Sequence, residues 1–178
     1  MSRKPKNPIT KVHTGFGNKG ETSFQGFIVK KDNELIEFVG DLDEACAFLG
    51  KLELNGMEFY QRILFEIGAM THSITALDSY KSNLDAYTKT VIEYINKIIT
   101  EDKLPALSGF IIPTKLNADT MIARAIVRRA ERSAVRAELT WAIPFLNALS
   151  DFLFVCSWQQ DCSNQWVGFK TEKVKKDV

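Results

Sequence analysis

Long apolar runs and cysteines are scarce in this chain of 178 residues. No stretch reaches the roughly 18 apolar residues of a membrane span, and the N-terminal MSRKPKNPITK lacks the apolar core of a secretory signal. The cysteines, Cys46, Cys156 and Cys162, have no CxxC spacing, and the first two fall in apolar helical patterns. We therefore expect a cytoplasmic protein, not associated with membranes, that has buried thiols and neither disulfides nor a zinc site.

An excess of charge of one sign is also missing. The 23 basic and 22 acidic residues leave a formal net charge of +1, which excludes a general electrostatic attraction to nucleic acid or to a membrane surface. Any polyanionic ligand must therefore bind to a local cluster of basic residues. The length suits one domain with a sizeable core.

Helical periodicity dominates the chain from Glu34 onward. Apolar residues recur with a period near 3.6 in five segments, which we predict as helices over 40–56, 57–77, 84–102, 118–138 and from about 142. The polar segment DSYKSN would separate the second helix from the third, and KLPALSGFIIPTK would form a connection. Short connections between amphipathic helices predict an all-α fold, a five-helix antiparallel bundle with a ferritin-like up-and-down arrangement.

The segments outside the helices are polar or irregular. Residues 1–33 are basic and contain several glycines, and we predict a flexible arm and loop; 34–168 would form the bundle domain, and 169–178 a loose charged tail. GFIVKK and LIEFV have some strand character but are short enough for the rim of the bundle. Pro144 suits the first turn of the fifth helix.

Four arginines lie four residues apart along the predicted fourth helix. They are Arg124, Arg128, Arg132 and Arg136, and Arg129 would point elsewhere. Like charges at this spacing each cost a few tenths of a kcal/mol, so the arginines need anionic partners. One interpretation is a solvated face relieved by Glu131 and Glu138; the other is a clamp for phosphate or carboxylate.

Two further helical segments carry candidate polar residues. Asp41, Asp43 and Glu44 could pair with the arginines, or could serve only as acidic residues in the first turn of the first helix. In the fifth helix, Asn147, Ser150 and Asp151 are spaced to share one face of an otherwise apolar segment. Hydrogen bonding in the core and a ligand site remain equally open for them.

A glycine-bearing loop, HTGFGNKGETS, offers another candidate site. Gly15, Gly17 and Gly20 would let the backbone approach a phosphate closely, with Lys19 as a donor. The loop matches neither GxxxxGK[ST] nor a strand-anchored GxGxxG, so a plain turn is the alternative. Neither His13 nor His72 has the Glu-x-x-His spacing of carboxylate-bridged metal bundles, and we predict no protein-bound metal.

Taken together, six ordered motifs resemble the PduO-type ATP:cob(I)alamin adenosyltransferases. They are GNKGETS, VKKDNELIEFVGDLDEACAFLG, QRILFEIGAM, LPALSGFIIP, ARAIVRRAER and LNALSDFLFV. The resemblance spans about Thr14 to Trp158. It implies a homotrimeric five-helix bundle with ATP between adjacent subunits, where a corrinoid reduced to Co(I) attacks the 5′ carbon of ATP and triphosphate leaves. ATP, Mg²⁺ and cobalamin would be its ligands, and a reductase or an adenosylcobalamin-dependent enzyme its protein partner.

The resemblance also implies roles for individual residues. Arg128 would bind the ATP phosphates, Arg124 would pair with Asp43 across the subunit interface, and Asn147 and Glu131 would line the nucleotide site. The residues that match the phosphate loop are Thr14, Gly17, Asn18, Lys19 and Gly20. Phe110 matches the aromatic residue that crowds the lower face of cobalt. Arg128, Asn147 and Phe110 are thus the expected catalytic residues.

The chain also departs from the family pattern. Gly15 and Phe16 replace a basic residue and a threonine, Asn18 replaces an aspartate, and PTK replaces Pro-Gly-Gly after the apolar strip. Cys46 stands where asparagine is common, and Met121 where histidine is usual. These changes keep two alternatives to an adenosyltransferase open: a corrinoid- or nucleotide-binding bundle without activity, and a purely structural bundle.

Overall fold

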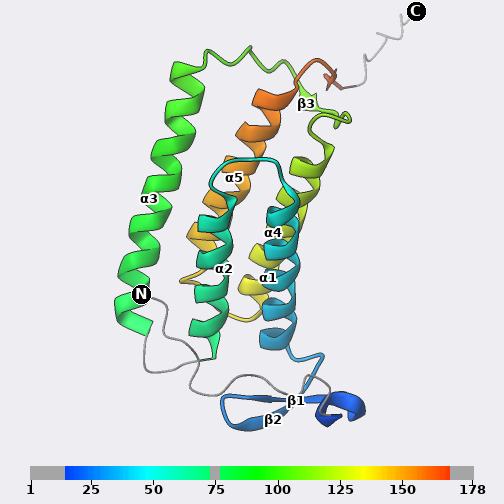
Figure 1. Cartoon of the computed structure of the whole chain (residues 1–178), viewed down its shortest axis with the longest axis vertical. Helices are drawn as coiled ribbons and strands as arrows, with labels where there is room; N and C mark the ends of the chain where they lie inside the picture. The colour runs from blue at the N-terminus through cyan, green and yellow to red at the C-terminus, as the bar shows by residue number, and fades with distance from the viewer. Residues whose placement is uncertain (1–14, 73–76, 169–178) are drawn as a thin grey trace, which may run out of the picture.

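The computed structural model describes residues 15–72 and 77–168. It contains five helices, as predicted: α1 Glu34–Lys51, α2 Met57–Thr71, α3 Leu77–Glu101, α4 Ala118–Arg136 and α5 Ile143–Gln160. Consecutive helices run in opposite directions, so α1, α3 and α5 point the same way (Figure 1). α1 packs on α2 and α4, α4 packs on α5, and α5 packs on α3.

Two helices begin earlier than the sequence pattern indicated. α1 begins at Glu34, because the side chain of Asn33 accepts a hydrogen bond of 3.0 Å from the amide of Leu35 and caps the helix. LIEFV is therefore helical, and the predicted strand character there is wrong. Asp41, Asp43 and Glu44 lie well inside α1 rather than in its first turn, which contains Glu34 and Glu37.

The predicted break at DSYKSN is also wrong, because α3 begins at Leu77 and includes these residues. Aspartate, serine and asparagine favour the starts of helices as well as turns, and this segment has no glycine or proline to stop a helix. The second helix correspondingly ends at Thr71 instead of continuing to residue 77. α4 and α5 agree with the prediction within about two residues, and Pro144 lies in the first turn of α5.

A small hairpin lies at the end of the bundle where α1 begins (Figure 1). A single 3₁₀ turn, η1 Phe16–Lys19, precedes the antiparallel strands β1 Glu21–Phe24 and β2 Phe27–Lys30. Gln25 and Gly26 both have positive φ, 52° and 83°, which suits a tight two-residue hairpin turn. The strand character of GFIVKK is confirmed, whereas the loop expected around residues 16–24 contains regular structure.

A second pair of strands lies at the opposite end of the bundle. β3 Phe110–Ile111, within the connection between α3 and α4, pairs antiparallel with β4 Gln165–Trp166, which follows α5. Both strands are too short for sequence periodicity to reveal. The two small sheets therefore mark the two ends of the long axis of the bundle (Figure 1).

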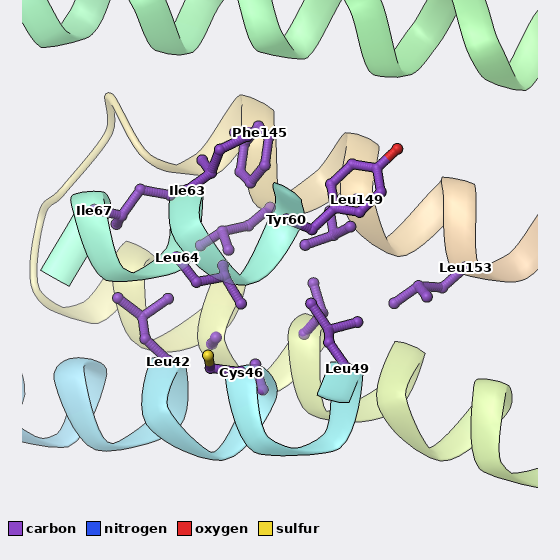
Figure 2. Packing of buried hydrophobic residues seen from close by; sticks show 14 of the residues in the cluster. Leu42, Cys46, Leu49, Tyr60, Ile63, Leu64, Ile67, Phe145, Leu149 and Leu153 are labelled. Atoms are coloured by element: carbon purple, nitrogen blue, oxygen red, sulfur yellow. The ribbon is translucent and has the colours of Figure 1, made fainter. Parts of the chain in front are cut away.

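The core lies where α1, α2, α4 and α5 meet. Figure 2 shows aliphatic and aromatic side chains from α1, α2 and α5 pointing toward one another; those labelled include Leu49, Ile67, Phe145 and Leu149, all fully buried. α4 contributes small side chains, Ala123, Ala130 and Ala134, which are also fully buried and let it approach its neighbours closely.

None of the helices in the described ranges is long and apolar enough to cross a membrane.

The cysteines occupy two kinds of position. Cys46 and Cys156 are buried thiols, as predicted, whereas Cys162, just beyond α5, is only half-buried. Burial raises the pKa of Cys156 to about 12 and, with smaller contributions from Cys156 and Tyr94, raises that of Tyr60 to about 12. Both groups are therefore held in their neutral forms within the core.

These two pKa shifts predict a loss of stability in alkaline solution. The folded state holds both protons more tightly than the unfolded chain, whose values are near 9.0 for the thiol and 10.0 for the phenol. Their contribution is complete below about pH 9 and disappears as the pH approaches 12. Denaturant unfolding at pH 8 to 11 should show this decline, and Tyr60→Phe should lessen it above pH 10. An unchanged decline in Tyr60→Phe would contradict the assignment to Tyr60.

Candidate functional site

The arginines of α4 separate into two pairs. Arg136 forms a 3.0 Å ion pair with Glu37 of α1, and Arg132 donates a 3.2 Å hydrogen bond to the carbonyl of Arg128. Neither Arg124 nor Arg128 forms an ion pair within residues 15–72 and 77–168. Both arginines therefore keep their charge available for an anion that this part of the chain does not supply.

Arg124 is the more constrained of the two. Its Nε is buried without a hydrogen-bond partner in the described part of the chain, and its guanidinium carbon lies 5.2 Å from the centre of the Phe154 ring. Burial lowers the pKa of Arg124, the charge of Arg128 lowers it further, and Asp151 opposes both effects. The guanidinium nevertheless remains charged at neutral pH. Arg124 is thus held in place on a ring and lacks one hydrogen-bond acceptor.

The polar residues of α5 have two different roles. Ser150 is fully buried and donates a 2.9 Å hydrogen bond to the carbonyl of Asn147, which assigns it to the core. Asn147 and Asp151 are exposed, and no hydrogen bond engages the Asn147 side-chain amide among the described residues. Asn147, Asp151 and Phe154 follow one another at helical spacing. Asn147 and Asp151 therefore lie on the same face of α5 as Phe154, whose ring contacts Arg124.

The acidic residues of α1 bind an arginine outside the predicted series. Arg129 donates a hydrogen bond of 3.0 Å from Nε to the carboxylate of Asp41 and also forms an ion pair with Glu44. Asp41 is buried and further accepts from the hydroxyl of Ser133. Arg129 does point away from Arg124 and Arg128, as predicted, and it connects α4 to α1. Glu131 and Glu138 form no ion pair with any arginine in the described ranges, so the solvated-face interpretation lacks its anions.

Asp43 lies on a different face from Arg124. It is exposed beside a groove of about 160 Å³ between α1 and α2, which Cys46 and His72 also line. No ion pair involves Asp43 in the described residues. The predicted bridge between Asp43 and Arg124 is therefore absent within one chain, as expected for a contact between subunits, and it stays a prediction.

The glycine-bearing loop forms the η1 turn and the residues around it. Gly15 and Gly20 flank the turn with φ of 74° and 78°, a conformation that favours glycine. Asn18 and Lys19 are exposed, and Thr14 lies outside the described residues. At Gly17 a Cβ atom would lie 2.7 Å from Nζ of Lys31, so a second ammonium group rests on this turn.

The hairpin is attached to the end of α2. Phe24 is buried, and its ring centre lies 4.4 Å from that of His72. The side chain of Gln25 donates a 2.9 Å hydrogen bond to the carbonyl of Thr71. His72 thus packs on the aromatic ring of Phe24.

Phe110 lies at the other end of the bundle. It is 74% exposed on β3, and its ring stacks with that of Trp166 at 6.1 Å between centres. The predicted site residues therefore occupy three separate places in one chain (Figure 1). η1 lies at one end and Phe110 at the other, and Arg124 and Arg128 of α4 with Asn147 of α5 form what we call the α4–α5 face along the bundle. A single chain does not bring η1 and Phe110 together.

Sequence reasoning missed Lys31, Gln165 and Trp166, and the ion pairs of Arg129. The sequence did contain a signal for the ion pair between Arg129 and Asp41. Asp41 falls on the same helical stripe as the apolar residues Phe38, Leu42 and Ala45. A buried carboxylate on such a stripe needs a cation. Lys31 and β4 gave no signal, since their roles depend on contacts between distant segments.

Three comparisons with known proteins agree with one another. Residues 12–159 match the family model of cobalamin adenosyltransferase. A corrinoid adenosyltransferase of Bacillus subtilis (strain 168) is 29% identical over 176 residues, covering 83% of this chain and 84% of that protein. The corrinoid adenosyltransferase MMAB of Bos taurus is 31% identical over 176 residues, covering 86% of this chain and 71% of that protein.

The fold also has a solved counterpart. A variant of the PduO-type ATP:corrinoid adenosyltransferase from Lactobacillus reuteri, complexed with cobalamin and ATP, matches with a TM-score of 0.67 and 25% identity. The match covers 84% of this chain and 91% of that one. Because the family model spans most of the chain and includes both the η1 loop and the α4–α5 face, the chain belongs to the cobalamin adenosyltransferase family.

Proposed function

We propose that this protein transfers the 5′-deoxyadenosyl group of ATP to cob(I)alamin. The Co(I) electron pair forms a cobalt–carbon bond with C5′ of ATP, the C5′–O bond breaks, and triphosphate leaves with the bonding electrons. The observation that carries the proposal is the pair Arg124 and Arg128, two neighbouring guanidinium groups without an anionic partner in the described chain, on a face with Asn147. Guanidinium groups suit the charge that develops on a departing triphosphate.

The residues of the α4–α5 face have distinct parts in this reaction. Arg128 is exposed and binds the ATP phosphates, while Asn147 and Glu131 line the nucleotide site. Arg124 pairs with Asp43 of a neighbouring subunit in a homotrimer, which supplies an anion for a guanidinium group that has no ion pair within the described chain. The ferritin-like arrangement and the trimer are part of this proposal, and a cytoplasmic location stays a prediction from the sequence.

The η1 loop of one subunit faces the α4–α5 face of the next. Its contribution comes from Gly17, Asn18, Lys19 and Gly20, together with Thr14. Lys31 supports this role, because its ammonium group rests on the turn at Gly17 and offsets the basic residue replaced at position 15. Mg²⁺ accompanies ATP, since phosphate oxygens are ligands that it prefers. The two ends of the bundle can then serve one site only if different subunits contribute them.

Phe110 supplies the corrinoid part of the site. Its exposed ring would lie against the lower face of cobalt and exclude an axial ligand, which favours the reduction to Co(I). Cobalamin contributes the nucleophile, and the protein binds and orients the two reactants. A corrinoid- or nucleotide-binding bundle without activity is the alternative, because Gly15, Phe16 and Asn18 depart from the family loop.

The test is an assay with purified protein, ATP, Mg²⁺ and chemically reduced cobalamin, followed by the loss of cob(I)alamin absorbance. We expect conversion well above the protein-free control. Conversion equal to that control would exclude the enzyme. Equilibrium dialysis with ATP and with adenosylcobalamin would then separate a binding protein, which takes up at least one of them, from a structural bundle.

A further inference from the structure

The connection that carries Phe110 is held by a segment outside the family match. β4, Gln165–Trp166, follows the matched residues 12–159 and is the pairing partner of β3, with Phe110 opposite Trp166 and Ile111 opposite Gln165. The amide of Ile112 extends this pairing with a 2.9 Å hydrogen bond to the carbonyl of Asn164. The position of Phe110 thus depends on residues that come after α5.

The side chain of Gln165 binds the backbone just before Phe110. Its Oε1 accepts hydrogen bonds from the Ser108 amide at 2.8 Å, the Ser108 hydroxyl at 3.1 Å and the Gly109 amide at 3.2 Å. Its Nε2 donates to the carbonyl of Cys162 at 2.9 Å, which fixes the amide in this orientation. Gln165 therefore restrains both residues that precede Phe110.

The backbones of the two segments are also in close contact. A Cβ atom at Gly109 would overlap the carbonyl group of Trp166, so only glycine allows this approach. Unlike five other glycines in the described ranges, Gly109 does not have a positive φ. The requirement for glycine at this position is one of space, and it keeps β3 against β4.

The ring of Trp166 restrains the ring of Phe110. The two rings stack with centres 6.1 Å apart and planes 28° from parallel. Phe110 is 74% and Trp166 44% exposed, so little else covers the phenylalanine ring. An exposed phenylalanine would otherwise exchange rotamers freely. The stack therefore limits the orientations that Phe110 adopts before any ligand arrives.

We propose that Gln165 and Trp166 are positioning residues that hold Phe110 ready to displace the lower axial ligand of cobalt. The inference rests on the proposed function and on its assignment of Phe110. A ring that excludes an axial ligand must stay within van der Waals contact of the metal centre, and small displacements of such groups are costly. Gln165 restrains the backbone of the ring, and Trp166 restrains its rotation.

The test compares Trp166→Ala and Trp166→Phe with the full-length wild-type chain. Electron paramagnetic resonance of cob(II)alamin, with ATP and Mg²⁺ present, measures the fraction of cobalt that has lost its lower axial ligand. We expect Trp166→Ala to lower this fraction and turnover about tenfold, with KM for ATP unchanged. Trp166→Phe, which keeps an aromatic partner, should retain most of both. An unchanged axial-ligand fraction in Trp166→Ala would overturn the inference.

A double-mutant comparison separates positioning from direct contact. If Trp166 acts through Phe110, Trp166→Ala should cause no further loss in a Phe110→Ala background. If the losses of turnover from the two single variants multiply in the double variant, Trp166 acts independently of Phe110, and the inference is overturned. Gln165→Ala should resemble Trp166→Ala, whereas Gln160→Ala, at an exposed residue nearby, is the matched control and should behave as wild type. A wild-type protein without turnover would instead refute the proposed function.

Discussion

Arg128→Ala is expected to lower kcat/KM for ATP at least about 100-fold while leaving the helix content unchanged. Arg128 is exposed, makes no side-chain ion pair in the described ranges, and lies beside Arg124, whose pKa it lowers. Removal of the Arg128 side chain should change the stability of the fold little, but it removes the positive charge that lies where triphosphate departs. Steady-state assays of cob(I)alamin consumption, with circular dichroism of the same samples, measure both effects.

The control is Arg132→Ala, one turn farther along α4. Arg132 is also exposed, and its side chain makes one hydrogen bond within residues 15–72 and 77–168, to the carbonyl of Arg128, so its removal should change kcat/KM less than about threefold. Arg128→Lys should fall between the two, because an ammonium keeps the charge but loses the planar pair of donors. Equal turnover in Arg128→Ala and Arg132→Ala would mean that the phosphate clamp lies elsewhere.

Arg129→Ala is expected to reduce the free energy of unfolding by about 2–3 kcal/mol. Asp41 is only 12% exposed at its side chain and would lose its cationic partner. Among the described residues, the buried carboxylate would then keep the Ser133 hydroxyl as its one side-chain donor. The estimate is below the roughly 3–5 kcal/mol of a fully buried pair because the Arg129 side chain is 40% exposed. Urea unfolding followed by circular dichroism measures the change.

Two comparisons test the physical reason for this loss. Lys51→Ala breaks another ion pair between α1 and α4, with Asp119, but both side chains are more than half exposed, so it should cost about 0–1 kcal/mol. Asp41→Asn should restore part of the stability of Arg129→Ala, because it removes the unpaired charge. If Asp41→Asn and Arg129→Ala have additive costs, the buried carboxylate is not the cause.

The helices were predictable because their apolar faces repeat at the helical period, whatever their neighbours are. Errors came where polar residues have two roles. Asp78, Ser79 and Asn83 were interpreted as a break although they belong to α3. Gly40 was taken as the start of the first helix although it lies within α1, because the cap at Asn33 precedes it. Propensity is a weak guide where the surrounding helix decides.

The candidate site was predictable only in part. Arg124, Arg128 and Asn147 were recognised as candidates because helical spacing places polar groups beside an apolar stripe. Lys31 and Trp166 were not, because Lys31 contacts the turn at Gly17 and Trp166 pairs with Phe110, and both contacts join segments that are separated in the sequence. Spacing along one helix cannot report such contacts. The role of the exposed Phe110 came from the resemblance rather than from any local pattern.

The arrangement of α3 has a consequence for how the molecule opens. α3 packs chiefly on α5, touches α2 through the edge contact of Tyr87 with Phe59, and leaves Ile92 and Tyr94 about half exposed. Among the described residues, α3 contributes Leu84 and Val91 to the buried core, fewer than any of the other four helices. Backbone amides of α3 should therefore exchange with deuterium through a partial opening of lower free energy than global unfolding. The longest helix would then be the least protected, and the molecule would contain two cooperative units within one domain.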